Sequence, residues 1–129
     1  MTMNRVAIIH LGSLVFLLAV AACDGGGSAP QEPPVATLDE GGVSPALISV
    51  ETGGSIQFVN GDQGPHQLYS YDCSELSTMI LQPAAEVSVQ LGVGPKVCHF
   101  QDMLAPLSSQ YWGTVEVAAP PPLPPTDQG

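Results

Sequence analysis

The sequence is poor in basic residues. Only 2 of its 129 residues are lysine or arginine, against 12 aspartates and glutamates, and the formal net charge is −10. One of the two, Arg5, lies in an N-terminal segment that we expect to be removed, which leaves Lys96 as the single lysine or arginine of the remaining chain. Binding to nucleic-acid phosphates requires clusters of lysine and arginine. The composition therefore excludes a nucleic-acid partner.

The sequence also lacks the common catalytic motifs. It contains no G-x-S-x-G nucleophile motif, no H-E-x-x-H zinc motif and no glycine-rich phosphate loop in front of a helix. We therefore expect a binding or structural protein and not an enzyme.

The N-terminal residues 1–22 have the features of a secretory signal. A single positive charge at Arg5 precedes an apolar run from about Leu11 to Ala22, which is shorter than the roughly 20 residues that a membrane-spanning helix needs. The run ends in VAAC, which resembles the lipobox of bacterial lipoproteins, where a peptidase cleaves before the cysteine and the thiol receives a diacylglycerol. The resemblance implies lipidation at Cys23 and a membrane anchor in the bacterial cell envelope, facing the periplasm or the exterior. The alternative is a transmembrane anchor that happens to end in cysteine.

Composition divides the rest of the chain into three parts. Residues 23–42 are rich in glycine, proline and acidic residues and are expected to form a flexible tether. Residues 119–129 form a proline-rich tail that cannot build a sheet, and we expect it to be extended and disordered. Between them, residues 43–118 make one small domain, near the size at which a hydrophobic core alone is marginal.

Apolar residues within this domain alternate with period two, as in half-buried β-strands. Turn signals rich in glycine and proline separate the alternating runs. Short strands at this spacing predict an all-β domain, either a sandwich or a barrel. The four runs are ALISVE (46–51), SIQFVN (55–60), EVSVQL (86–91) and GTVEV (113–117).

Two stretches of the domain resemble the small bacterial cupredoxins of the plastocyanin and azurin type. Residues 44–68, SPALISVETGGSIQFVNGDQGPHQL, are similar to their first strands and to the loop that ends in Pro-His. The segment CHFQDMLAP, which begins at Cys98, and the later WGTVEV resemble their last loop and final strand. The resemblance implies a Greek-key β-sandwich with any metal at one end. The usual copper site of this family takes one histidine from the upstream loop, and a cysteine, a histidine and often a methionine from the last loop.

The resemblance makes His66 the upstream copper ligand. Pro65 stiffens the approach to it and removes a competing backbone N–H. Imidazole, thiolate and thioether ligands together serve both Cu(I) and Cu(II). The alternative is a loop histidine that bonds to the backbone.

The last loop departs from the family pattern. The third residue after Cys98 is Gln101, where the usual pattern has histidine. A related group of exported cupredoxin-like proteins has a His-Asp-His element, and alignment on Asp102 places Gln101 and Met103 where its two histidines stand. Glutamine is a poor copper ligand, whereas methionine suits Cu(I). His99 is adjacent, but strand alternation points it away from Cys98, so it becomes a ligand only if the backbone turns there.

Two cysteines, Cys73 and Cys98, remain once Cys23 is lipidated. Such a pair in a small exported domain most often forms a disulfide. Closing this loop would stabilise the fold by roughly 3.5 kcal/mol in the chain-entropy model. A bridged Cys98 has no thiolate to offer copper, so a disulfide and a thiolate–copper bond exclude each other. We predict the disulfide.

Two functions remain open. In the first, the protein binds copper, as Cu(I), through His66, Met103 and His99, and serves copper handling or electron transfer with a redox or copper-handling protein of the envelope. In the second, the copper site has decayed, the Cys73–Cys98 disulfide closes the sandwich, and the protein is a structural or interaction lipoprotein. Copper is the one cofactor predicted, and only in the first.

Overall fold

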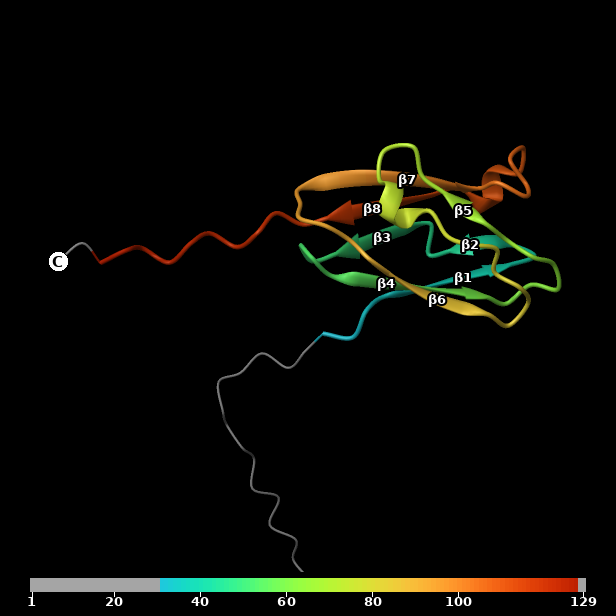
Figure 1. The fold of residues 1–129 in the computed structure, drawn as a ribbon, viewed down its shortest axis with the longest axis horizontal. Coiled ribbons are helices and arrows are strands. Elements are labelled where there is room, and N and C mark those ends of the chain that lie inside the picture. Colours follow the sequence, from blue (N-terminus) through green and yellow to red (C-terminus); the bar gives the residue numbers. More distant parts are fainter. Residues whose placement is uncertain (1–30, 128–129) are drawn as a thin grey trace, which may run out of the picture. The chain divides into compact units, whose positions relative to one another are not determined.

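The computed structural model describes residues 31–127. The signal segment and Cys23, on which the lipoprotein prediction depends, lie outside this range. The strands form two sheets of four, stacked face to face (Figure 1). The domain is an all-β Greek-key sandwich, as the sequence predicted. No helix within the described range is long and apolar enough to cross a membrane.

The first sheet has the strand order β2-β1-β4-β6. β1 runs parallel to β4, and the other neighbours in this sheet are antiparallel. The strands are β1 (Val35–Asp39), β2 (Gly42–Ser44), β4 (Ser55–Asn60) and β6 (Glu86–Gln90).

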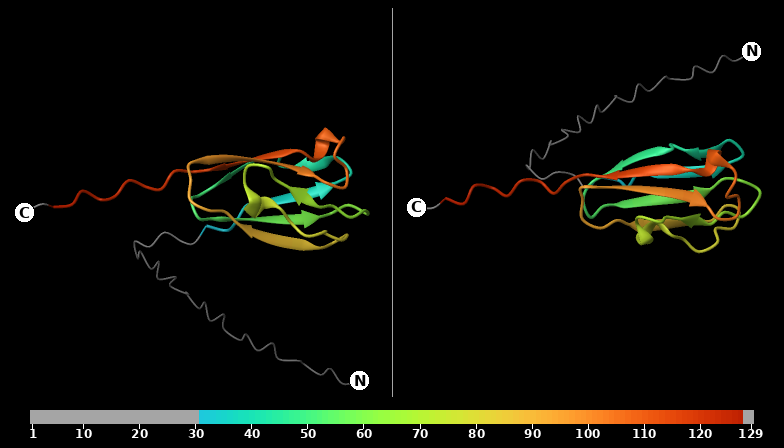
Figure 2. Two further views of the ribbon diagram at one scale, coloured as in Figure 1. Left: turned by 45° about the horizontal axis from the view of Figure 1, so that its top comes forward. Right: turned by 90° about the horizontal axis from the view of Figure 1, so that it is seen from above.

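The second sheet has the order β3-β8-β7-β5, with β3 parallel to β8 and the other pairs antiparallel. Figure 2 shows the two sheets from two further directions. The strands are β3 (Leu47–Val50), β5 (Leu68–Tyr69), β7 (Lys96–Asp102) and β8 (Gly113–Val117), and two short 3-10 turns, η1 (Ser74–Leu76) and η2 (Ser109–Tyr111), lie in the connections.

The predicted alternation is confirmed in every one of the four runs. In β4, for example, Ile56 and Phe58 are fully buried, while Gln57 and Val59 are partly exposed. Phe58 from the first sheet meets Phe100 from the second edge-on, with ring centroids 5.4 Å apart. Burying one such side chain contributes about 1.5–3 kcal/mol, so contacts of this kind hold the two sheets together.

The domain begins earlier than predicted. We expected residues 23–42 to be a tether, but β1 and the first residue of β2 fall within them. β1 pairs with both β2 and β4, and its Ala36 and Leu38 are fully buried. The alternation of VATLD was hidden by the prolines before it and the acidic, glycine-rich turn after it. The boundary of the domain therefore lies before Val35.

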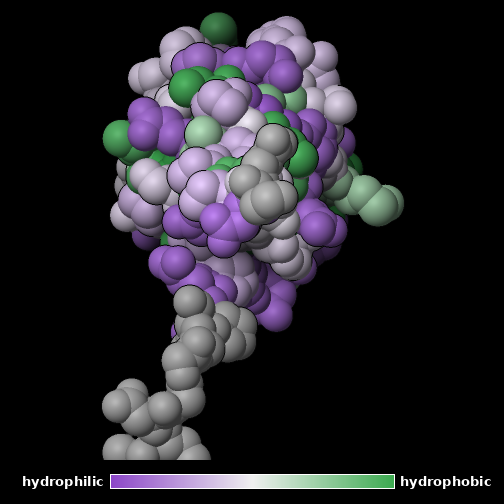
Figure 3. Space-filling view, turned by 90° about the vertical axis from the view of Figure 1, so that its left-hand side faces the viewer, coloured by the Kyte–Doolittle hydropathy of each residue, from purple (hydrophilic) through white to green (hydrophobic). Residues whose placement is uncertain are grey.

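The described chain enters and leaves the sandwich at the same end. Pro34, just before β1, and Val117, at the end of β8, line one hollow there. Figure 3 faces this end, and hydrophilic residues dominate it, with hydrophobic ones only in scattered spots. The candidate site lies at the opposite end, where β4 and β7 finish.

Candidate functional site

The loop that carries His66 is held by a buried asparagine. Asn60 ends β4 with no exposed surface, and its Nδ2 donates to the carbonyl oxygens of Gly64 and Leu81, each at 2.9 Å. Its Oδ1 accepts the backbone N–H of Asp62 at 2.9 Å. His66 and Leu81 exchange two backbone hydrogen bonds. The loop is therefore fixed at both ends.

His66 is buried with both ring nitrogens against carboxylates. The residue is 4% exposed. Its Nδ1 lies 2.6 Å from Oδ2 of Asp102, and its Nε2 lies 3.1 Å from Oδ2 of Asp62. Each ring nitrogen therefore has a carboxylate oxygen within hydrogen-bond distance, and the side chain links Asp102 to Asp62.

Asp102 is the buried centre of this network. It has no exposed surface, and its Oδ1 accepts the backbone N–H of Gln67 at 3.0 Å and of Leu104 at 2.9 Å. A buried carboxylate without partners would be strongly destabilising. With these two bonds and His66, Asp102 instead joins the end of β7 to the segment that leads into β5.

Tyr111 closes the network from η2. Its hydroxyl donates to the carbonyl oxygen of Asp39 at 2.9 Å and lies 3.2 Å from Oδ2 of Asp62. Its ring centroid is 4.7 Å from that of His66. Burial raises the pKa of the Tyr111 hydroxyl, so it remains a donor. The backbone N–H of Gln63, together with His66 and Tyr111, holds the pKa of Asp62 below its ordinary value.

No family model matches the sequence, and neither does any curated protein sequence. Solved structures match in fold. A purple cupredoxin from Nitrosopumilus maritimus gives a TM-score of 0.57 at 16% identity, covering 66% of this chain and 99% of that one. Amicyanin from Paracoccus versutus gives 0.57 at 13% identity, covering 70% and 85%. A mutant amicyanin in its reduced Cu(I) form at pH 4 gives 0.57 at 12% identity, covering 70% and 86%.

The described domain has a cupredoxin-like fold. At these sequence identities the likeness establishes the fold and nothing finer. What the end of the sandwich can bind must be read from its own residues.

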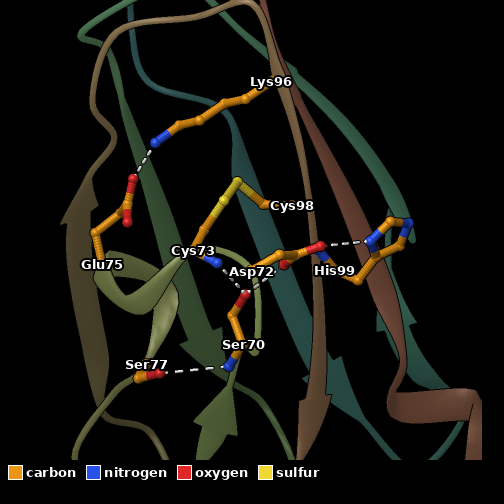
Figure 4. The surroundings of a disulfide bond; sticks show 8 residues. All are labelled: Ser70, Asp72, Cys73, Glu75, Ser77, Lys96, Cys98 and His99. Carbon is orange, nitrogen blue, oxygen red and sulfur yellow. Dashed lines mark hydrogen bonds and ion pairs between the residues drawn. A yellow bond between two sulfur atoms is a disulfide. The ribbon is translucent and has the colours of Figure 1, made fainter.

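The cupredoxin-like domain contains the predicted disulfide. Cys73 and Cys98 are bridged, with Cα atoms 5.5 Å apart, and both are buried. Figure 4 shows the bridge joining the start of η1 to β7, between the ion pair of Lys96 with Glu75 and the Asp72–His99 pair. Cys98 also precedes Asp102 by four residues of extended strand, which places it about 13 Å from the His66 end. It is thus bridged and also in the wrong place for a ligand beside His66.

His99 lies on the outer face of the cupredoxin-like domain, as strand alternation predicted. Its side chain is 66% exposed, and its Nδ1 lies 2.8 Å from Oδ2 of Asp72. Its backbone N–H donates to Oδ1 of the same aspartate at 2.9 Å. These bonds, the side-chain one first, lower the pKa of Asp72 to about 2. His99 is therefore an exposed hydrogen-bonding residue that points away from the His66 network.

Met103 does reach the His66 end of the cupredoxin-like domain. Its backbone N–H donates to the carbonyl oxygen of Gln67 at 2.7 Å, and Gln67 follows His66 directly. The residue is 49% exposed. Of the three predicted copper ligands, the fold thus brings the backbones of His66 and Met103 together and leaves His99 apart.

Copper does not fit the residues as they are arranged here. An imidazole ligand needs a ring nitrogen with a free lone pair, and both nitrogens of His66 face carboxylate oxygens. Within residues 31–127, no group of three or more His, Cys, Asp or Glu side chains is arranged to hold a metal ion. The ligand set of His66, Met103 and His99 is therefore not assembled in this structure.

Sequence reasoning missed Asp62 and Tyr111 and used Asp102 only to align the last loop. One signal for Asp102 was present, because the inward alternation of Cys98 and Phe100 continues to it. A buried acid requires a donor, and the histidine of the upstream loop was the obvious one. Tyr111 lies 49 residues from Asp62 in the chain, and no spacing pattern links the two.

Proposed function

We propose that this chain is an envelope lipoprotein whose cupredoxin-like domain binds a protein partner and carries no copper. One observation carries the proposal: His66, at the position where the family has its upstream copper ligand, is held by carboxylates on both ring nitrogens. A histidine so placed acts as a cross-link between the loop at Asp62 and the end of β7. The residue serves the stability of the scaffold.

The disulfide supports the same proposal. The Cys98 sulfur is committed to Cys73, and its position on β7 keeps it from the His66 end. The bridge and the His66 network together fasten β7 at two points, about 13 Å apart along the strand. A sheet that is held rigid in this way can offer a fixed surface to a protein partner.

Attachment to a membrane is the second part of the proposal. Lipidation at Cys23 would place the domain on a short tether in the cell envelope, since each buried CH₂ of the acyl chains contributes about 0.8 kcal/mol to anchoring. Replacing Cys23 by serine is expected to abolish lipid labelling and to release the protein from the membrane fraction.

Copper handling is the second candidate function, favoured by the fold likeness to a reduced Cu(I) amicyanin. It would require Nε2 of His66 to leave Asp62, whose side chain is the more exposed of the two partners at 16%, and Met103 to turn toward it. Copper binding would then compete with the His66–Asp62 pair.

Thermal and urea unfolding with and without copper separates the two candidates. We expect neither Cu(I) nor Cu(II) to raise the melting temperature, because no ligand set is assembled. We expect His66→Ala to destabilise the copper-free protein by about 3 kcal/mol, because the buried Asp102 carboxylate loses its side-chain partner and keeps only two backbone N–H donors. A copper-induced rise in melting temperature that His66→Ala abolishes would overturn the proposal, since a ligand selective for the folded state must stabilise it.

A further inference from the structure

A groove crosses the outer face of the second sheet. It encloses about 400 Å³, toward the lower end of the roughly 300–1,000 Å³ of typical ligand sites. Two aromatic side chains border it, Tyr71 at 78% exposure and Trp112 at 49%. His99, Gln101 and Thr114 line it between them, and His99 pairs with Thr114 across β7 and β8. The groove surface is thus mostly apolar, with a few polar side chains from two neighbouring strands between the aromatic residues.

The aromatic border is supported by its neighbours. The ring of Tyr69 packs edge-on against Tyr71 with centroids 4.8 Å apart, and Nε2 of Gln101 donates to the Tyr71 hydroxyl oxygen at 3.2 Å. The Tyr71 O–H therefore remains available as a donor. The indole N–H of Trp112 has no acceptor among residues 31–127. The groove offers apolar rings and hydrogen-bond donors, which is the chemistry that binds polyproline helices, whose carbonyls are exposed acceptors.

The chain itself contains a segment of matching chemistry. Residues 120–125 read PPPLPP, and no charged residue lies between Val117 and Asp127. The tail is exposed and without regular structure, with Leu123 91% exposed, and Figure 1 shows it in red beyond the end of β8. Such a segment favours the polyproline conformation before it binds, which lowers the entropy lost on binding.

The groove of the same copy is hard for this tail to reach. The groove lies at the start of β8, whereas the tail leaves at its end. The backbone N–H of Ala118 donates to the carbonyl oxygen of Val50 at 2.8 Å, which continues the direction of the strand. Only Ala119 then remains between the strand and the stiff prolines, and the chain would have to reverse its direction at this one residue to reach the groove. A second copy demands no such reversal.

We propose that the groove bordered by Tyr71 and Trp112 binds the Pro120–Pro125 segment of a second copy of this chain. This inference names the partner for the protein-binding function proposed above, namely a second copy of the chain. It rests on that proposed function. Copies tethered to one membrane meet at a raised local concentration, which favours contacts too weak to persist in dilute solution.

The single tryptophan makes the contact measurable. Trp112 is the only one in the chain, so its emission reports the groove alone. All the strands of the described range lie between Val35 and Val117, so the unlipidated chain from residue 24 contains the whole sandwich and is a suitable sample. We expect its sedimentation coefficient to rise and its Trp112 emission to shift to the blue together as concentration increases. A variant with Pro122, Leu123 and Pro124 all changed to serine should stay monomeric with unshifted emission.

A peptide of residues 118–127 tests the groove directly. Added to the triple-serine tail variant, it should restore the blue shift, whereas the same peptide carrying the three serines should not. Tyr71→Ser should weaken peptide binding at least about tenfold, as loss of an aromatic anchor does. Leu107→Ser is the matched control, because Leu107 is 97% exposed and lies outside the groove.

Three results would overturn the inference. The first is association that persists in the triple-serine tail variant, and the second is a peptide that does not change Trp112 emission. The third is a blue-shifted emission in the monomer that the tail variant loses, because this would mean that the tail docks within one copy. Failure of the proposed function is distinguishable, because copper bound at His66 would leave the fluorescence titration intact. A failed titration would equally leave the copper result unchanged.

Discussion

Two neighbours decide what His66 can do. A neutral imidazole binds metal through the lone pair of one nitrogen, but each nitrogen of His66 lies within hydrogen-bond distance of a carboxylate oxygen, from Asp102 or Asp62. The side chain that the family resemblance predicted as a copper ligand is a buried cross-link in this structure. Both aspartates are needed for this cross-link, because Asp102 occupies only Nδ1 and Asp62 occupies Nε2.

The exposed Asp72–His99 pair makes stability depend on pH. Hydrogen bonds from the His99 side chain and then its backbone N–H lower the pKa of Asp72 from 3.8 to about 2. A carboxyl with a depressed folded-state pKa stabilises the fold above its unfolded value, and that contribution is lost as pH falls through the folded value. The Asp72 contribution is therefore complete above about pH 4 and lost toward pH 2. Because Asp72 is 41% exposed, solvent screening keeps it small.

Urea unfolding between pH 4 and pH 2 checks this sign. We expect the stability difference between the parent protein and Asp72→Asn to shrink as the pH falls through this interval. Asp127→Asn, in the exposed tail, is the matched control and should follow the parent at every pH. A parent–Asp72→Asn difference that stays constant across the interval would contradict the prediction.

At the scale of residues, the sequence predicted contacts that follow from local pattern. The outward direction of His99 came from strand alternation, and the Cys73–Cys98 bridge came from the count of cysteines in a domain that we expected to be exported. The His66 network was not predictable in the same way. Tyr111 and Asp62 meet only because two distant connections arrive at one end of the sandwich, and no sequence period records that.

The strand β7 carries most of the chemistry of the domain. Its inward side chains are the bridged Cys98, the core ring of Phe100 and the buried carboxylate of Asp102. Its outward side chains His99 and Gln101 line the groove. The network and the groove therefore lie on opposite faces of one element, and β7 must stay in register for both to exist.

The disulfide is expected to be a large part of the stability of this small domain. A closed loop with a 25-residue separation corresponds to roughly 3.5 kcal/mol in the chain-entropy model. We expect the double variant Cys73→Ser, Cys98→Ser to lose about this much in urea unfolding of the unlipidated chain. Added reductant should destabilise the parent protein and leave the double variant unchanged. Equal midpoints for parent and double variant would contradict the expectation.

Elements were predictable where alternation was long and its flanks were plain. β4 and β8 stood out in the sequence, because four or more residues alternate between clear turn signals. β1 alternates equally well, but its acidic and glycine-rich surroundings have the composition of a linker. β5 has only two residues, too few for any period, and it exists because β7 provides a pairing edge.

The domain needs β1 to fold, although the boundary predicted from composition, at residue 43, leaves this strand out. A fragment of residues 43–118 would lack a strand that lies between β2 and β4 and would expose the core at Phe58. We expect this fragment to be unfolded by circular dichroism and by thermal scanning, while residues 31–118 fold cooperatively. A cooperative transition for the shorter fragment would show that β1 is dispensable.

The fold class was predictable at the scale of the whole molecule because two independent signals agreed. Period-two alternation required sheets, and the resemblance of residues 44–68 to cupredoxin strands selected the sandwich. The binding chemistry was not predictable from that resemblance, because Gln101 departs from the family pattern and because only the fold brings Asp62 and Tyr111 to His66.

Because basic residues are scarce, the sandwich contains a single peptide bond that trypsin can cleave. Lys96 is the only lysine or arginine among residues 31–127, and its bond to Val97 lies inside β7, paired with β8. Trypsin therefore has one place to cut, and it gains access only when that strand detaches. The two pieces would stay joined through Cys73 and Cys98 and would separate on a gel only after reduction. The rate of this one cleavage therefore reports how often the domain opens.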